Sequence, residues 1–177
     1  MPCHGLRFAW APLLPRNGAE GVRVYLSWYS LRRVILTAGW APSLVFAVHV
    51  VLSQGIGAYE AYPSIDIPMH ALGGFVMAYF VARCVALVQA EGMDRAVRRA
   101  ATAAFVVTAT ATAAVFWEFA EYTADAMFSM SAQLGLEDTL LDLALGIVGA
   151  VAFVSVDGWR GLLGLSENRD PNGRSSL

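Results

Sequence analysis

The sequence contains no lysine and only two cysteines, and charged residues make up 15% of its 177 positions. Two cysteines, Cys3 and Cys84, are too few for a disulfide framework, so cross-links are not expected to stabilise the fold. The low charge content, with 57% hydrophobic residues and a mean hydropathy of +0.54, excludes an ordinary soluble domain. The chain is therefore predicted to be a single integral membrane protein.

Positive charge is absent from two long stretches of the chain. All twelve basic residues are arginines, and none lies between positions 34 and 82 or between positions 100 and 159. Segments rich in arginine tend to stay on the cytoplasmic side of a membrane. Both termini are therefore expected to be cytoplasmic (N-in/C-in), and no nucleic-acid partner is expected.

Four apolar segments are long enough to cross a bilayer as helices. We therefore predict an all-α integral membrane four-helix bundle. Its helices are expected at about 34–52, 67–90, 100–125 and 138–156. Pro42 lies inside the first segment and is expected to kink it. The alanine-rich third helix and the fourth helix, which carries Gly146, Gly149 and Ala150, are expected to form the tightest pair because small residues let helices approach closely.

The chain divides into three predicted regions. Prolines and glycines interrupt residues 1–21, whereas residues 22–31 mix aromatic and aliphatic side chains with arginine, as is typical of a membrane interface. We expect residues 1–33 to form a cytoplasmic arm with a short interfacial helix. Residues 34–159 are then the transmembrane domain, and the polar residues 160–177 are a cytoplasmic tail.

Acidic residues and one histidine gather at the same end of three predicted helices. Helix by helix, they are Asp66 and His70, Glu118 and Glu121, and Asp138 and Asp142. Spacings of three or four residues place each pair on one helix face. Counted from the nearest cytoplasmic arginine, Glu118 and Asp142 lie roughly 28 and 27 Å along their helices at a rise of about 1.5 Å per residue. The three pairs are therefore predicted to lie at the same depth in the membrane, near its extracytoplasmic side.

No arginine is predicted at this depth to neutralise the carboxylates. Like charges without a counter-ion must share protons, face open water or bind a cation. Carboxylates with one imidazole suit a divalent ion such as Mg, Mn, Ca, Fe or Zn. All six residues are therefore candidate metal ligands, and Glu118 and Glu121 are candidate general bases if the protein is an enzyme.

Each of these residues also has a purely structural explanation. Asp66 and Asp138 could cap helix N-termini, and His70 could be a hydrogen-bonded core histidine. Trp117 and Tyr122 have the character of interfacial anchors. The whole set could also be a polar network that closes the outer end of the bundle.

Three functions remain open on the sequence alone. The favoured one is a binding module whose outward-facing pocket holds a divalent cation, or a cationic or metal-bridged head group of a membrane lipid. The second is a metal-dependent membrane hydrolase of a lipid-linked or phosphorylated substrate. The third is a small cation or proton transporter, for which a homodimer would enlarge the path.

Several short motifs link this chain to known membrane proteins. They are Asp66 with His70 and Gly74, Trp117-Glu118 with Glu121, and Asp138-Thr139 with Asp142 and Gly149-Ala150. In these motifs, over roughly residues 60–155, the chain resembles the YjdF-like family and, more distantly, the VanZ-like family. It departs from the VanZ-like pattern, which tends to have glutamine near Glu121 and asparagine at the position of Gly146. The resemblance implies a multi-pass protein of the bacterial cell envelope, located in the inner (plasma) membrane, and implies no particular activity.

Overall fold

The computed structural model describes residues 28–86, 94–128 and 132–156. Helices account for nearly all of these residues, and no strand occurs among them. The predicted all-α fold is therefore confirmed. The predicted arm over residues 1–21 and the predicted tail over residues 160–177 lie outside the described residues.

The first apolar segment forms a bent pair of helices. Helix α1 spans Trp28–Ala38, helix α2 spans Trp40–Val50, and the two are bent by 44°. Pro42 explains the bend, because it has no N–H to donate to the carbonyl of Ala38 and its ring crowds that carbonyl. The predicted kink is confirmed. However, α1 starts before residue 34 and includes the last residues of the predicted interfacial helix, whose residues 22–27 are not described.

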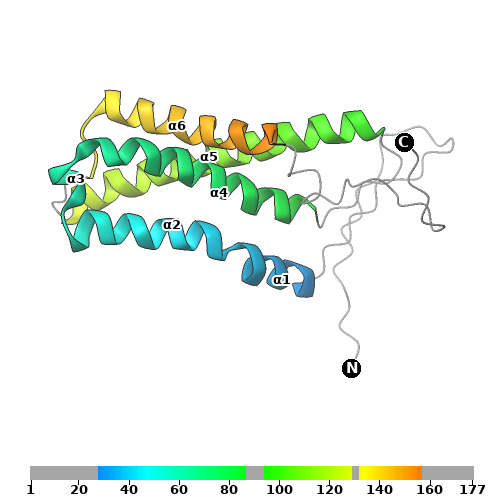
Figure 1. The fold of residues 1–177 in the computed structure, drawn as a ribbon, viewed down its shortest axis with the longest axis horizontal. Coiled ribbons are helices and arrows are strands. Elements are labelled where there is room, and N and C mark those ends of the chain that lie inside the picture. The colour runs from blue at the N-terminus through cyan, green and yellow to red at the C-terminus, as the bar shows by residue number, and fades with distance from the viewer. Residues whose placement is uncertain (1–27, 87–93, 129–131, 157–177) are drawn as a thin grey trace.

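The connection between α2 and α4 is made of tight turns. A π-helical turn over Val51–Gly55 extends α2, helix α3 spans Ala58–Ala61, and a 3-10 turn covers Pro63–Ile65. Gly57 has a φ of 59°, a left-handed conformation that favours a residue without Cβ. These turns reverse the chain and place α3 beside the start of α4 (Figure 1).

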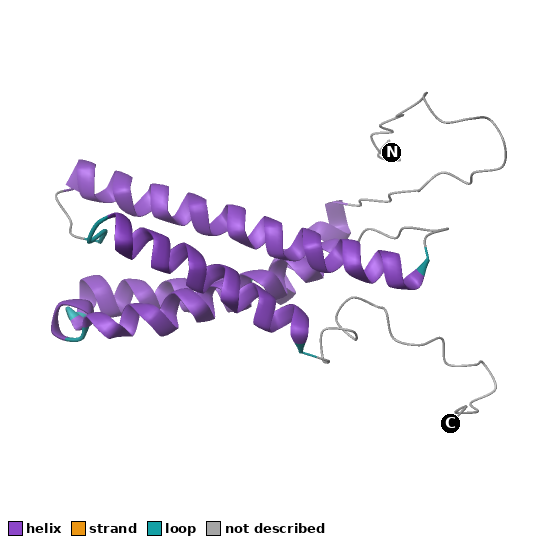
Figure 2. Ribbon diagram, turned by 90° about the horizontal axis from the view of Figure 1, so that it is seen from above, coloured by secondary structure: helices purple, strands orange, loops and turns teal. Residues whose placement is uncertain are grey.

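Three further helices form the rest of the bundle: α4 (Asp66–Val85), α5 (Arg95–Phe128) and α6 (Leu136–Ser155). Each is long and apolar enough to cross a membrane, and the bent pair α1 and α2 makes a fourth span if it is counted as one. In Figures 1 and 2 the helices run along a common long axis. The start of α4, the end of α5 and the start of α6 lie at one end, as the sequence predicts.

The tightest helix pair is α4 with α6, which corrects the prediction that the third and fourth predicted helices, α5 and α6, pack closest. A Cβ at Gly74 would overlap the carbonyl oxygen of Gly146, and a Cβ at Gly149 would overlap that of Ala71. The two backbones therefore approach at positions where glycine leaves no side chain between them. Ala114 of α5 packs beside Gly146, so a third helix also contacts the place where α4 and α6 approach closely.

An apolar core lies away from the acidic end of the bundle. It consists of small and aromatic side chains from three helices: Ala78, Ala82, Val106, Ala150 and Phe153. Phe75 of α4 meets the ring of Phe153 edge to face, with 5.4 Å between centroids. This core holds α4, α5 and α6 together, and its close packing fixes the relative positions of the three helices that carry the polar residues.

Gly74→Ala is expected to destabilise the detergent-solubilised protein by about 1–3 kcal/mol, because the new methyl group overlaps a backbone carbonyl. Gly73→Ala is the matched control, since a Cβ at Gly73 meets nothing within 4 Å. That change should be neutral or stabilising by up to about 1 kcal/mol through helix propensity. Thermal unfolding followed by circular dichroism measures both; equal melting temperatures would contradict the close α4–α6 contact.

Candidate functional site

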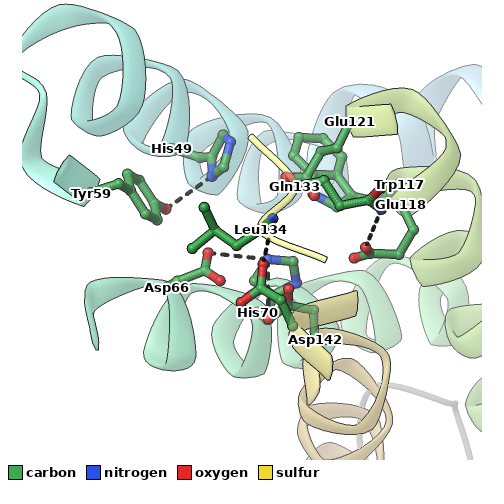
Figure 3. Close-up of polar contacts among 11 residues, drawn as sticks. His49, Tyr59, Asp66, His70, Trp117, Glu118, Glu121, Gln133, Leu134 and Asp142 are labelled. Atoms are coloured by element: carbon green, nitrogen blue, oxygen red, sulfur yellow. Dashed lines mark hydrogen bonds and ion pairs between the residues drawn. The ribbon is translucent and has the colours of Figure 1, made fainter. Parts of the chain in front are cut away.

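His70 lies between two carboxylates that come from different helices (Figure 3). Its Nε2 is 3.2 Å from Oδ1 of Asp66, one turn earlier on α4, and 3.7 Å from Oδ1 of Asp142 on α6. Asp142 is only 3% exposed, so its carboxylate is held inside the bundle. The contact between Gly74 and Gly146 lies one turn further along both helices. The close approach of α4 and α6 is therefore what brings His70 and Asp142 together.

The two glutamates of α5 contribute to the same centre. Glu118 is 5% exposed, and its Oε2 accepts a hydrogen bond from Nε2 of Gln133 at 3.5 Å. Glu121, about one turn further along α5, accepts a hydrogen bond from Nε1 of Trp117 at 2.8 Å. Each glutamate is thus oriented by a side-chain donor that carries no charge. The role of Trp117 in this network differs from the interfacial anchor that the sequence suggests.

Two overlapping groups of potential metal ligands result, and both contain His70. Asp66 and Asp142 complete one group, and Glu118 and Glu121 complete the other. Within each group the ligand atoms all lie within 4.8 Å of one another. The structure thus brings together every residue of the sequence-predicted set except Asp138.

These carboxylates have no arginine partner in the described parts of the chain. The ion pairs of Asp66 and Asp142 are both with His70, and the two glutamates bond to uncharged donors. The described arginines lie in α1, in the last turn of α4 and in the first turns of α5, at the opposite end of the bundle (Figure 1). Among the described residues, His70 is therefore the basic side chain that pairs with these carboxylates.

Asp138 lies outside both ligand groups. Its Oδ2 accepts the backbone N–H of Leu134 at 3.2 Å, so its carboxylate orders the turn before α6. Asp125 acts in the same way, accepting the N–H groups of Ala132 and Gln133 at 2.8 and 2.9 Å. The second of these bonds positions Gln133, whose side chain reaches the cluster. A ligand role for Asp138 stays a prediction, and the alternative that Asp138 is the N-cap is wrong, because Gly135 holds that position.

A second histidine, which sequence reasoning does not single out, lies beside the cluster. Nδ1 of His49 on α2 is 2.9 Å from the hydroxyl of Tyr59 on α3, and the His49 ring packs edge-on against Trp117 with 5.1 Å between centroids. Burial, followed by the negative charges of the cluster, raises the pKa of Tyr59 to about 12, so its hydroxyl keeps its proton and can donate to His49. The sequence signal that could have identified His49 was its ionisable side chain inside an apolar span.

A cavity of about 370 Å³ lies next to the cluster, among α2, α4 and α5. Most of its lining is apolar, but His49, His70 and Trp117 all contribute to its wall. Thr110 of α5 also lines it, is 1% exposed, and has no hydrogen-bond partner for its hydroxyl. The polar cluster and the apolar cavity are therefore continuous.

Together, the fold and this cluster define a multi-pass membrane protein with a buried group of acidic and histidine side chains. The family model described as "Predicted membrane protein (DUF2238)" matches residues 22–160, so the chain belongs to this family. An "Uncharacterized protein" of Thermotoga maritima is 30% identical over 110 residues. That match covers 62% of this chain and 55% of the relative, so the chain spans little more than half of the relative's length. No solved structure matches the chain.

The pairing of His70 with Asp142 predicts strong coupling between the two positions. His70→Asn combined with Asp142→Asn should cost less stability than the sum of the single variants, because His70→Asn alone leaves buried carboxylates without a cationic neighbour. The expected coupling energy is about 1 kcal/mol or more, from thermal unfolding of the four proteins.

The control cycle replaces Asp142→Asn with Glu137→Gln, at an exposed position in the first turn of α6. Its coupling to His70→Asn should stay below about 0.5 kcal/mol. Coupling of equal size in both cycles would show that His70 and Asp142 do not interact specifically.

Proposed function

We propose that the protein is a binding module that holds a divalent cation at the His70 cluster, either as a free ion or as a bridge to a lipid head group. The observation that carries the proposal is the position of His70 within two groups of carboxylates from three helices. An ion in the first group would be held by α4 and α6, and an ion in the second group by α4 and α5. Its binding would therefore tie two of the helices together.

The burial of the carboxylates supports a cationic ligand. Glu118 and Asp142 are 5% and 3% exposed, and taking carboxylates out of water is unfavourable unless they take up protons or a positive charge compensates. A single histidine shared by four acidic side chains compensates them incompletely. A divalent ion would supply the missing charge, and the mixture of oxygen and imidazole donors suits Mn²⁺, Fe²⁺ or Zn²⁺ as well as Mg²⁺ or Ca²⁺.

The hydrogen bonds around the cluster also support a binding role. Trp117 donates to Glu121, and Gln133 donates to Glu118, so each carboxylate is held in place by an uncharged donor. Donors of this kind orient ligating groups in metal sites and raise their affinity.

The arginines support a location of the cluster on the outer side of a bacterial inner membrane. Every arginine in the described residues lies at the end of the bundle opposite His70. Arginine-rich ends stay on the cytoplasmic side. We therefore propose cytoplasmic termini, with α3 and the His70 cluster facing outward.

Metal binding tests the proposal directly. The purified full-length protein should retain Mn²⁺ or Zn²⁺ through desalting, as measured by inductively coupled plasma mass spectrometry and by titration. Glu118→Gln and Asp142→Asn should each lower the affinity by about tenfold or more, because each removes a charged ligand.

Glu137→Gln is the matched control, since Glu137 is exposed and belongs to neither ligand group. Its affinity should equal that of the unmodified protein. If the unmodified protein binds neither metal, or if all three variants bind with the same affinity, cation binding at this cluster is excluded.

The proposed orientation predicts which positions react with a membrane-impermeant maleimide. In a Cys3→Ser/Cys84→Ser background, Glu60→Cys in α3 should be labelled in spheroplasts, because this exposed position would lie outside. Val97→Cys, exposed in the first turns of α5, should be labelled only after the membrane is opened. The opposite pattern would reverse the topology.

A further inference from the structure

The cavity next to the cluster is short and ends inside the bundle. Its lining runs from His49 to Pro42 on α2 and from Trp117 to Thr110 on α5. Both stretches correspond to a length of roughly 10 Å at the helical rise. Val106, one turn before Thr110 on α5, belongs to the packed apolar core. The cavity therefore has a polar outer end at His49 and an inner end at Thr110.

Thr110 provides a polar group at the inner end that lacks a partner within the described parts of the chain. Thr108 and Thr112 on the same helix donate to backbone carbonyls of α5 at 2.9 and 3.0 Å. Thr110, in contrast, is 1% exposed and its hydroxyl has no partner. Buried hydroxyls in proteins are nearly always hydrogen-bonded, so this group needs an acceptor from within the cavity that it lines.

The walls around Thr110 favour an organic ligand over water as that partner. A buried water is held by two to four polar groups. Met77, Ala113 and Ala114 line this part of the cavity and offer no polar side-chain group. The hydroxyl of Ser43, on the α2 wall, already donates to a carbonyl of its own helix. The acceptor for Thr110 is therefore expected to belong to an otherwise apolar molecule.

His49 provides a second donor at the outer end of the cavity. Its Nδ1 is 2.9 Å from the hydroxyl of Tyr59, which keeps its proton and donates it (Figure 3). Neutral histidine then carries its own proton on Nε2, which has no partner among the described residues. The four carboxylates of the His70 cluster lie beside His49 and would repel an anion. The matching acceptor is therefore an uncharged oxygen.

We infer that the cavity binds an uncharged ring compound with carbonyl oxygens at opposite ends, which is the chemistry of a quinone head group. One carbonyl accepts a hydrogen bond from His49 and the other accepts one from Thr110. The inference goes beyond the proposed function and does not depend on it, because neither residue belongs to a group of potential metal ligands.

The dimensions of the cavity agree with such a ring. With a hydrogen bond of about 2.9 Å at each end of a roughly 10 Å cavity, the two acceptor atoms would lie roughly 4–5 Å apart. Carbonyl oxygens on opposite sides of a six-membered ring have about this separation. The volume of about 370 Å³ exceeds the roughly 150 Å³ that suffices for a benzene ring. Phe46 and Trp117, whose rings meet edge to face at 5.7 Å, give the cavity an aromatic wall.

Calorimetric titration of the full-length protein in detergent tests the inference. The probe is duroquinone, a benzoquinone with four methyl groups and two opposed carbonyls, and EDTA is present so that no divalent ion contributes. Duroquinone should bind one to one. Durene, the hydrocarbon with the same ring and methyl groups but no carbonyl, should bind at least about tenfold more weakly because two hydrogen bonds are lost. Absence of duroquinone binding, or equal affinity for the two compounds, would overturn the inference.

Two threonine substitutions of identical chemistry locate the inner contact. Thr110→Val should weaken duroquinone binding by about fivefold, since one hydrogen bond is lost, and should leave durene binding unchanged. Thr112→Val, at an exposed position of the same helix, should change neither. Thr110→Val should not lower the melting temperature, because its hydroxyl has no partner in the described residues. Equal duroquinone affinity of the two variants contradicts the contact at Thr110.

A pair of His49 variants tests the outer contact independently of Thr110. His49→Phe keeps an aromatic ring but removes the donor, and it should weaken duroquinone binding by about fivefold. His49→Gln retains an N–H donor and should bind duroquinone more tightly than His49→Phe does. If His49→Phe binds duroquinone as tightly as the unmodified protein, recognition of two carbonyls is excluded.

Discussion

The close approach of α4 to α6 is the contact on which the rest of this protein depends. Gly74 and Gly149 leave no side chain between the two backbones, and each faces a backbone carbonyl of the partner helix. Because His70 and Asp142 lie one turn from the Gly74–Gly146 contact, the separation of the helices sets the distance between these two side chains. In a membrane, where packing replaces the hydrophobic drive between helices, small residues of this kind determine which helices pair. The position of the site therefore follows from the packing of the bundle.

This packing concentrates negative charge where water is scarce. Four carboxylates from α4, α5 and α6 share one close histidine, while the described arginines lie at the far end. Trp117 and Gln133 donate uncharged hydrogen bonds to the glutamates, which orients them without neutralising them. Carboxylates held away from water in this way are stabilised either by protons or by a positive charge, and an apolar cavity adjoins them.

Sequence reasoning succeeded where the controlling interactions are local. Apolar length predicted the spans, Pro42 predicted the bend, and spacings of four and three residues placed Asp66 with His70 and Glu118 with Glu121. It failed where the answer depended on a partner helix. The alanines of α5 suggested the tightest contact, but glycines on α4 and α6 approach closer because they lack even a methyl group. His49 was passed over because nothing in its own segment shows that α2 meets the cluster.

The sequence by itself determined an all-helical membrane protein, the depth shared by its acidic residues and the end of the bundle at which they lie. These properties follow from hydropathy and from the fixed rise and turn of a helix, which act along a single segment. Only the tertiary structure decided that α4 pairs with α6, that His49 and Trp117 border the site, and that Asp138 bonds to the backbone of Leu134. Those outcomes depend on how side-chain volumes fit between helices that are far apart in the chain, and no local pattern encodes that fit.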